Sequence, residues 1–205
     1  ERLGRYTESE PLNKRALQVY GRTLGADHPL VATALNNLAE LYRQTGRANQ
    51  AEPLYKQAID VQERTLGINH PDVGRSLNNL GHLYHTQGRY SEAEPLYERA
   101  LAVRTTALGP AHPDVGQSLN NLAGLYERQG RLSEAEPLYK QALTVYEKAI
   151  GPDTPSVATS LNNLAGLWMA QGRYGEAEPL YRRVLGIRQK ALGPDHQYVG
   201  QAMNN

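Results

Sequence analysis

The 205-residue sequence contains no cysteine and almost no excess charge of either sign. Without cysteine there can be no disulfide, thiolate zinc site or cysteine nucleophile, and a reducing compartment, by default the cytoplasm, is expected. Lys and Arg number 22 and Asp and Glu 21, so the net charge is +1. Nucleic acids and anionic lipids require a clustered basic excess. We therefore expect no nucleic-acid partner.

Long apolar runs and catalytic motifs are also lacking. No apolar stretch approaches the roughly 18 residues of a membrane-spanning helix, and residues 1–5 carry no signal-peptide core. There is no glycine-rich phosphate loop, no His-Glu-x-x-His motif and no nucleophile elbow. These absences predict a soluble protein with no membrane partner, no cofactor and no enzymatic activity.

What the sequence does contain is a repeat of 42 residues. The step Asn-Asn-Leu begins at Asn36, Asn78, Asn120 and Asn162, and Gly-Arg pairs begin at Gly4, Gly46, Gly88, Gly130 and Gly172. A fixed period of this size is typical of stacked repeat proteins. We expect one array, with a partial repeat over 1–28, full repeats over 29–70, 71–112, 113–154 and 155–196, and the start of another over 197–205. The sequence would then begin at the tail of one helix and end inside another, as expected of a fragment.

Each repeat predicts two helices. An apolar stripe predicts a first helix from about Pro29 to Gln44, ended by Gly46. Asn49 and Glu52 have the spacing of a capping box, which predicts that the second helix starts there. The same spacing occurs at Thr7 and Glu10, Ser91 and Glu94, and Ser133 and Glu136.

Proline and glycine refine the second helix. Pro53 is expected in its first turn, where few intrahelical bonds are lost, and Gly67 is expected to end it in a left-handed cap. Proline is also tolerated at the start of each following first helix. Full helix pairs should begin near residues 29, 71, 113 and 155, preceded by one unpaired second helix.

Two amphipathic helices cannot bury their stripes alone, so the pairs must stack. The predicted fold is all-α, a right-handed superhelical solenoid of stacked antiparallel helix pairs. Small residues should allow close helix contact one turn before an aromatic residue that fills the core. The small residues are Ala39, Gly81, Ala123 and Ala165, and the aromatic residues are Tyr42, Tyr84, Tyr126 and Trp168.

The order of these residues resembles the tetratricopeptide repeat, whose usual period is about 34 residues. The motifs Ser-Leu-Asn-Asn-Leu-Ala, Gln-Gly-Arg-Tyr, Glu-Ala-Glu-Pro-Leu-Tyr and Leu-Gly-Pro-Asp-His are similar to those of the kinesin light chain variant, and the match covers essentially the whole chain. The resemblance implies a scaffold that binds an extended peptide in a concave groove lined by the first helices. No heptad segment for a motor heavy chain is present.

The resemblance also implies which residues face the groove. In the first full repeat they are Thr33, Asn36, Asn37, Glu40, Arg43 and Gln44. The second asparagine of each pair matches a contact to peptide backbone, for which a carboxamide is suited because it donates and accepts hydrogen bonds. The predicted peptide contacts are Asn37, Asn79, Asn121 and Asn163, with Asn36, Asn78, Asn120 and Asn162 beside them. The alternative is that these asparagines bond to a neighbouring helix and set the pitch.

Specificity should come from positions that differ between repeats. Arg75, His82 and Arg43 are such positions on the first helices, and Arg104 on a second helix matches a place where kinesin light chains use a basic residue. His82 and His85 lie three apart without a third ligand, so we expect no metal site. Four further histidines, at His28, His70, His112 and His196, are expected to serve loop structure.

The predicted partner is therefore a protein or peptide. A second possibility is an architectural spacer, or a self-association or sensor arm of a larger signalling protein. The uncapped terminal repeats also suggest end-to-end association of copies. An RNA-binding array is disfavoured, because identical asparagine pairs would recognise the same base in every repeat.

Overall fold

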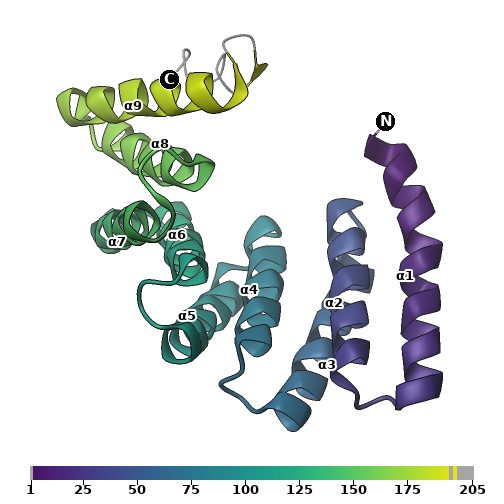
Figure 1. Ribbon diagram of the computed structural model, residues 1–205. Helices are drawn as coiled ribbons and strands as arrows, with labels where there is room; N and C mark the ends of the chain where they lie inside the picture. Colours follow the sequence, from purple (N-terminus) through teal and green to yellow (C-terminus); the bar gives the residue numbers. More distant parts are fainter. Residues whose placement is uncertain (1, 194–195, 198–205) are drawn as a thin grey trace. The chain divides into compact units, whose positions relative to one another are not determined.

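The computed structural model describes residues 2–193 and 196–197, with side chains from residue 9 onward except that of residue 192. Along this part of the chain there are nine α-helices and no strand (Figure 1). They are α1 (Arg2–Leu24), α2 (Pro29–Gln44), α3 (Ala48–Leu66), α4 (Pro71–Thr86), α5 (Tyr90–Leu108), α6 (Pro113–Arg128), α7 (Leu132–Ile150), α8 (Pro155–Ala170) and α9 (Tyr174–Leu192). The all-helical, tetratricopeptide-like class is confirmed.

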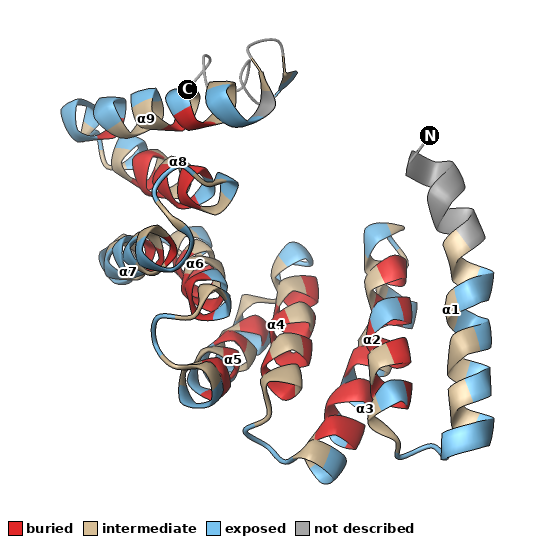
Figure 2. Ribbon diagram, viewed as in Figure 1, coloured by how far each residue is buried: buried red, intermediate tan, exposed pale blue. Residues whose placement is uncertain are grey.

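The chain forms two compact units divided between Ala107 and Leu108. In the first unit α1 packs on α2, α2 on α3 and α3 on α4, and α2 also lies beside α4. In the second unit α6 packs on α7, α7 on α8 and α8 on α9, with α6 beside α8. Figure 2 shows buried residues concentrated where neighbouring helices of a unit face each other. Each unit is thus a stack of helix pairs, whereas one uninterrupted array stays a prediction.

The first helices start where the sequence predicts, at Pro29, Pro71, Pro113 and Pro155. Three of them are capped by a histidine in the preceding loop. Nδ1 of His28, His70 and His112 accepts a hydrogen bond from the backbone N–H two residues further on, at 3.1 to 3.2 Å. This bond satisfies one of the free N–H groups at the helix start. The expected structural role of these three histidines is confirmed.

The Gly-Arg turn between the two helices of a repeat is a Schellman motif. Gly46 has φ of 74°, its N–H donates to the carbonyl of Arg43 at 3.1 Å, and the N–H of Arg47 donates to the carbonyl of Tyr42 at 2.8 Å. Glycine suits this position because a side chain would strain positive φ. The turns at Gly88, Gly130 and Gly172 repeat this geometry, and none of the four is crossed by a helix.

The predicted capping box is wrong. α3 begins at Ala48, with Arg47 at the N-cap position and no side-chain cap, so Asn49 already lies inside the helix. α5 and α7 likewise begin before Ser91 and Ser133. The turn itself determines the start, because Arg47 continues directly from the Schellman motif. Pro53 consequently lies in the second helical turn rather than the first.

Two further details differ from the prediction. Gly67 does end α3 with positive φ, but its ψ of 153° places it outside the left-handed helical region. α1 runs unbroken through Gly4 and Arg5, where a turn was predicted.

The predicted core is confirmed except at Trp168, which is only partly buried. Tyr42, Tyr84 and Tyr126 are buried, and so are Ala39, Ala123 and Ala165 one turn earlier. At Gly81 an added Cβ would lie 2.9 Å from Cδ1 of Tyr97, so glycine permits an unusually close helix contact there.

The two ends bear on the predicted end-to-end association. On α1 the side chains of Leu12 and Val19 are 69% and 46% exposed. The further repeat predicted over 197–205 lies outside the described residues from residue 198 onward. Association of copies therefore stays a prediction.

Candidate peptide-binding face

Each first helix has one accessible side, which we call the open stripe. None of its residues is buried. It comprises Thr33, Asn37, Glu40, Arg43 and Gln44 of α2, Arg75, Asn79, His82, His85 and Thr86 of α4, Gln117, Asn121, Gly124, Glu127 and Arg128 of α6, and Thr159, Asn163, Gly166, Met169 and Ala170 of α8. They recur three or four residues apart and so share a helix face. Most other residues of these helices are buried.

The second asparagine of each pair lies on the open stripe. Asn37 is exposed, and Asn79, Asn121 and Asn163 are partly buried. Nδ2 of Asn79 is 3.5 Å from Oδ1 of Asn36, which is the long limit for a hydrogen bond. These carboxamides can reach a ligand, although at least that of Asn79 also touches the neighbouring first helix.

The first asparagine of each pair has a different place. Asn36 is buried and donates to Oγ of Ser76, whose hydroxyl in turn donates to Oε1 of Gln62 at 2.6 Å. Asn120 donates to Oγ of Ser160 at 2.7 Å. Asn78 is buried as well, and Asn162 is partly buried.

These bonds link one repeat to the next inside a unit, because buried polar groups require partners. The prediction that Asn36 and Asn78 contact a peptide is therefore corrected: both lie within the stack. For Asn36 the structure contains the alternative arrangement, a hydrogen bond to the neighbouring helix α4.

Arg104 is a second correction. Its side chain is 2% exposed and its Cγ lies 2.9 Å from where a Cβ on Gly74 would be, so it packs beneath α4 instead of facing a groove. The equivalent residues Gln62 and Tyr146 are also buried. This position packs the second helix against the first.

The remaining candidates lie on the open stripe. Arg75 is bonded to Asp72 at 2.9 Å, and its side chain remains 43% exposed. Arg43 forms two bonds to Glu40, at 2.6 and 2.8 Å. His82 is partly buried, and this burial, assisted by Arg43 and His85 and opposed by Glu40, lowers its pKa.

Buried tyrosines of the second helices form hydrogen bonds to carboxylates of the open stripe. Oη of Tyr55 donates to Glu40 at 2.8 Å, and Oη of Tyr139 donates to Glu127 at 2.8 Å. Burial alone raises the pKa of Glu40, but the hydrogen bonds from Arg43 and Tyr55 outweigh it and the net pKa is lowered. Glu40 is thus held ionised by its partners, and both carboxylates are bonded to a buried tyrosine.

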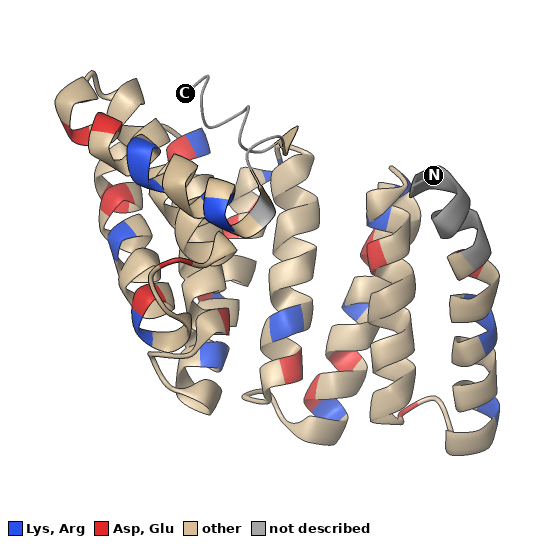
Figure 3. Cartoon of the chain, turned by 45° about the horizontal axis from the view of Figure 1, so that its top comes forward, with Lys and Arg blue, Asp and Glu red and all other residues tan. Residues whose placement is uncertain are grey.

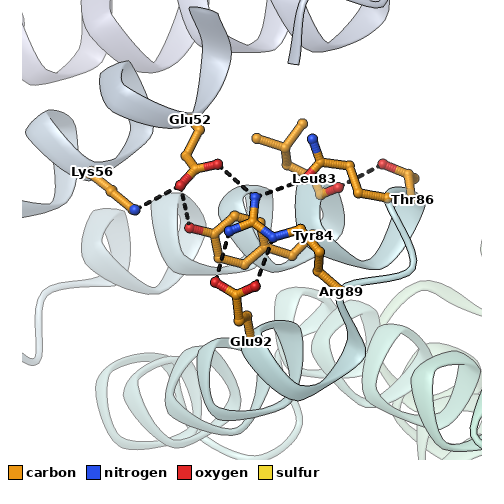
Figure 4. A network of polar contacts seen from close by, with 8 residues as sticks. Glu52, Lys56, Leu83, Tyr84, Thr86, Arg89 and Glu92 are labelled. Carbon is orange, nitrogen blue, oxygen red and sulfur yellow. Dashed lines mark hydrogen bonds and ion pairs between the residues drawn. The ribbon is translucent and has the colours of Figure 1, made fainter. Parts of the chain in front are cut away.

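A polar link between repeats was missed by the sequence reasoning (Figure 4). Arg89, from the Gly-Arg turn, lies 3.9 Å above the ring of Tyr84 and bonds to Glu52 of the preceding repeat at 2.7 Å. Oη of Tyr84 donates to the same Glu52 at 2.9 Å, and Arg89 also forms an ion pair with Glu92. The hydrogen bond from Arg89, with burial opposing, lowers the pKa of Glu52 to about 2.

The same link recurs between Arg47 and Glu10 and between Arg173 and Glu136, at 2.8 and 2.7 Å. The glutamates are those that the sequence assigned to capping boxes. Their recurrence every 42 residues together with the Gly-Arg pair was the available signal. The link therefore belongs to the stacking of repeats.

A separate groove of about 610 Å³ lies in the first unit between α3 and α5, over α4. Ile59, Leu77, Leu80 and Leu96 contribute its apolar part, and it shares no residue with the open stripe. The sequence reasoning did not anticipate it.

The described residues also bear on metal sites and on membrane-spanning helices. Nowhere among them do three metal-ligating side chains gather, and none of their helices is long and apolar enough to cross a membrane. Figure 3 shows basic and acidic residues mixed along the helices of both units.

Comparison with solved structures identifies repeat proteins. Two crystal structures of a putative kinesin light chain from Podosopora anserina with nearly identical TPR-like repeats are each 28% identical to this chain. The first has a TM-score of 0.76, and the match covers 92% of this chain and 89% of that one. The second has a TM-score of 0.74, and the match covers 93% of this chain and 90% of that one. BtubC (BKLC) from P. vanneervenii, 23% identical with a TM-score of 0.80, covers 97% of this chain and 83% of its own and supports the fold alone. No curated protein sequence matches.

Family models give the clearest assignment. One model of the tetratricopeptide repeat matches residues 1–64, 31–106, 87–148 and 114–169, and another matches 157–198. The matches together span nearly the whole sequence, and the family is typically a non-enzymatic scaffold for protein–protein interaction. The chain belongs to the tetratricopeptide repeat family, with repeats similar to those of kinesin light chain-like proteins.

Proposed function

We propose that the open stripes of the first helices bind an extended segment of a partner protein. The observation that carries this proposal is the pattern on the stripe. One asparagine recurs at the same accessible position of every first helix, while the residues around it differ from repeat to repeat. A repeated carboxamide suits a peptide backbone, and the varied neighbours suit its side chains.

The spacing of the first helices supports an extended ligand. Packed helices lie about 8–10 Å apart, and an extended peptide advances about 3.3 Å per residue. Within each unit, where α2 lies beside α4 and α6 beside α8, one asparagine would then meet about every third ligand residue. A few such bonds, each contributing about 0.5–1.5 kcal/mol, together with side-chain contacts lead us to expect micromolar affinity.

The test replaces Asn79 and Asn121 together with Ala. We expect any peptide that binds the open stripe to lose at least about tenfold in affinity, with helical content unchanged by circular dichroism. The matched control is the pair Asn36→Ala and Asn120→Ala, which removes the first asparagines. Because these bond to Ser76 and Ser160, the control should lower the melting temperature.

The two variants separate ligand binding from packing. If the Asn79 and Asn121 variant keeps its affinity and melts at a lower temperature, the second asparagines are structural and the proposal is wrong. Binding would be measured by fluorescence anisotropy with peptides from a partner identified by crosslinking.

A further inference from the structure

One buried hydroxyl of the first unit lacks the partner that its counterparts have. Tyr55, Tyr97 and Tyr139 occupy the same position of successive second helices and are 0%, 0% and 2% exposed. The hydroxyls of Tyr55 and Tyr139 donate to Glu40 and Glu127. Oη of Tyr97 is buried and has no hydrogen-bond partner.

The open stripe explains the difference. Glu40 and Glu127 occupy two stripe positions three residues apart, and either position supplies a carboxylate to the tyrosine of its repeat. In the repeat of Tyr97 these two positions are His82 and His85. The edge-on ring of His85 has its centroid 6.2 Å from that of Tyr97. The repeat therefore has the buried tyrosine but not the carboxylate.

Gly81 fixes the tyrosine in this place. An added Cβ there would come within 2.9 to 3.0 Å of Cδ1 and Cε1 of Tyr97, so the ring lies directly against α4. The equivalent residue above Tyr55 is Ala39. The close contact holds the hydroxyl beneath the open stripe instead of letting the ring move toward another acceptor.

The surroundings favour an incoming negative charge. Charged and titratable groups near the two histidines include Arg43 and Glu40 from α2, Tyr97 from α5, and Tyr90, whose ring lies 5.7 Å from that of His85. Glu40 is already engaged by Arg43, Gln44 and Tyr55. Burial raises the pKa of Tyr97, with Arg43 opposing, so its hydroxyl is a proton donor at neutral pH.

We propose that His82, His85 and the hydroxyl of Tyr97 form a subsite for a carboxylate that the bound segment supplies. The inference rests on the proposed function and names one chemical feature of the ligand, an Asp or Glu side chain or a C-terminal carboxylate. The ligand replaces the glutamate that the repeats of Tyr55 and Tyr139 carry themselves. It accepts a hydrogen bond from Tyr97 and one from an imidazole.

The probes are three short acetylated peptides titrated into the 205-residue chain. One is Ser-Ala-Glu-Ala-Ser with an amidated end, the second has Gln in place of Glu, and the third is Ser-Ala-Ala-Ala-Ser with a free C-terminus. Binding is followed by NMR of the imidazole and tyrosine ring resonances and of the asparagine side-chain amides. We expect a carboxylate-bearing peptide to bind at least about tenfold more tightly than the Gln peptide. Which of the two does so identifies the source of the carboxylate.

Two variants test the subsite itself. Tyr97→Phe removes only the unpartnered hydroxyl, so it should melt no lower than the parent and should bring the affinity for the carboxylate peptide down to that for the Gln peptide. His82→Glu places a carboxylate where α2 has Glu40. We expect this variant to melt at a higher temperature and to lose the preference for the carboxylate peptide.

Protonation provides an independent readout. A bound carboxylate favours the charged imidazole, so binding takes up a proton and the affinity should rise as the pH falls from 8 to about 6. Tyr139→Phe, which removes a hydroxyl that already has a partner, is the control and should leave the preference unchanged.

The outcomes distinguish this inference from the proposed function. Equal affinity of all three peptides, with shifts at the Asn79 side chain, would overturn the subsite and leave the peptide face standing. A carboxylate preference that survives Tyr97→Phe would also overturn it. A preference lost in Tyr97→Phe but untouched by the Asn79 and Asn121 variant would uphold the subsite and count against the peptide face.

Discussion

Glycine inside the helices shows how one residue position depends on its neighbour. An added Cβ at Gly116 would lie 3.1 to 3.2 Å from three atoms of the buried Tyr146 ring, whereas at Gly166 the nearest atom is Oη of Tyr181 at 3.8 Å. Packing against Tyr146 therefore requires glycine at position 116, whereas no neighbouring atom requires it at position 166. Gly166 lies on the open stripe, where an added methyl group would meet no close neighbour.

This contrast predicts opposite effects for the same substitution. Gly116→Ala should destabilise the protein by about 1–3 kcal/mol, because a rigid buried ring must move. Gly166→Ala should stabilise it by up to about 1 kcal/mol through helix propensity. Chemical denaturation of both variants measures the difference. A stabilised Gly116→Ala variant would mean that the contact between Gly116 and Tyr146 is looser than described.

Residue-level predictions from the sequence succeeded where a single helix decides and failed where a neighbouring helix does. The spacing of Asn37 and Glu40 sufficed to place both on one face of α2. The same spacing could not reveal that Asn36 is covered by α4 or that Arg104 packs beneath Gly74, because burial there depends on the distance between helices. Tyr97 shows the same limit, since its missing partner appears only when three repeats are compared in space.

At the scale of elements, the glutamate near the start of each second helix connects one repeat to the next. In the link of Figure 4, Glu52 receives Arg89 and the hydroxyl of Tyr84. The sequence predicted the first helices well because proline and histidine mark their starts locally. It misplaced the second-helix starts because these follow from the backbone of the Gly-Arg turn, and a glutamate three residues after Asn or Ser reads as a cap from the sequence alone.

The link predicts an acid-sensitive contribution to stability. The pKa of Glu52 is about 2 in the folded chain and about 4.3 in an unfolded one. The lowered pKa means that the contribution is fully present above about pH 4.3 and is lost as the pH falls toward 2. Glu52→Gln should therefore cost about 1 kcal/mol at pH 6, and less as the pH approaches 2. Thermal melting of both proteins between pH 2 and 6 measures this difference.

Glu178 is the matched control for this experiment. It occupies the same repeat position, but it pairs with Arg182 on its own helix, and both side chains are largely exposed, at 61% and 79%. Such a pair contributes little, so Glu178→Gln should change stability by less than about 0.5 kcal/mol at any pH in the range. An equal loss in both variants would show that Arg89 and Tyr84 add nothing to Glu52.

At the scale of the whole molecule, stacked repeats contact only their neighbours along the chain, and their stability is a sum of repeat and interface contributions. The period of 42 residues was therefore enough to predict the class of fold, because every repeat solves the same packing problem. What the period could not predict is the division into two compact units between Ala107 and Leu108, since an exact repeat marks every junction alike.

A local defect in a stack of repeats should affect mainly the neighbouring helices. Ser76 accepts a bond from Asn36 and donates to Gln62, all three buried. Ser76→Ala should cost about 1–3 kcal/mol, because two buried groups lose their partner. In a stack the loss is transmitted to adjacent helices first, so native-state hydrogen exchange should show lowered protection in α2 to α5 and little change in α8 and α9. Ser160→Ala, which removes the acceptor for Asn120, should give the converse pattern in α6 to α9. Uniform loss of protection along the chain in both variants would mean that the repeats unfold as one cooperative body, and that the neighbour-by-neighbour account is wrong.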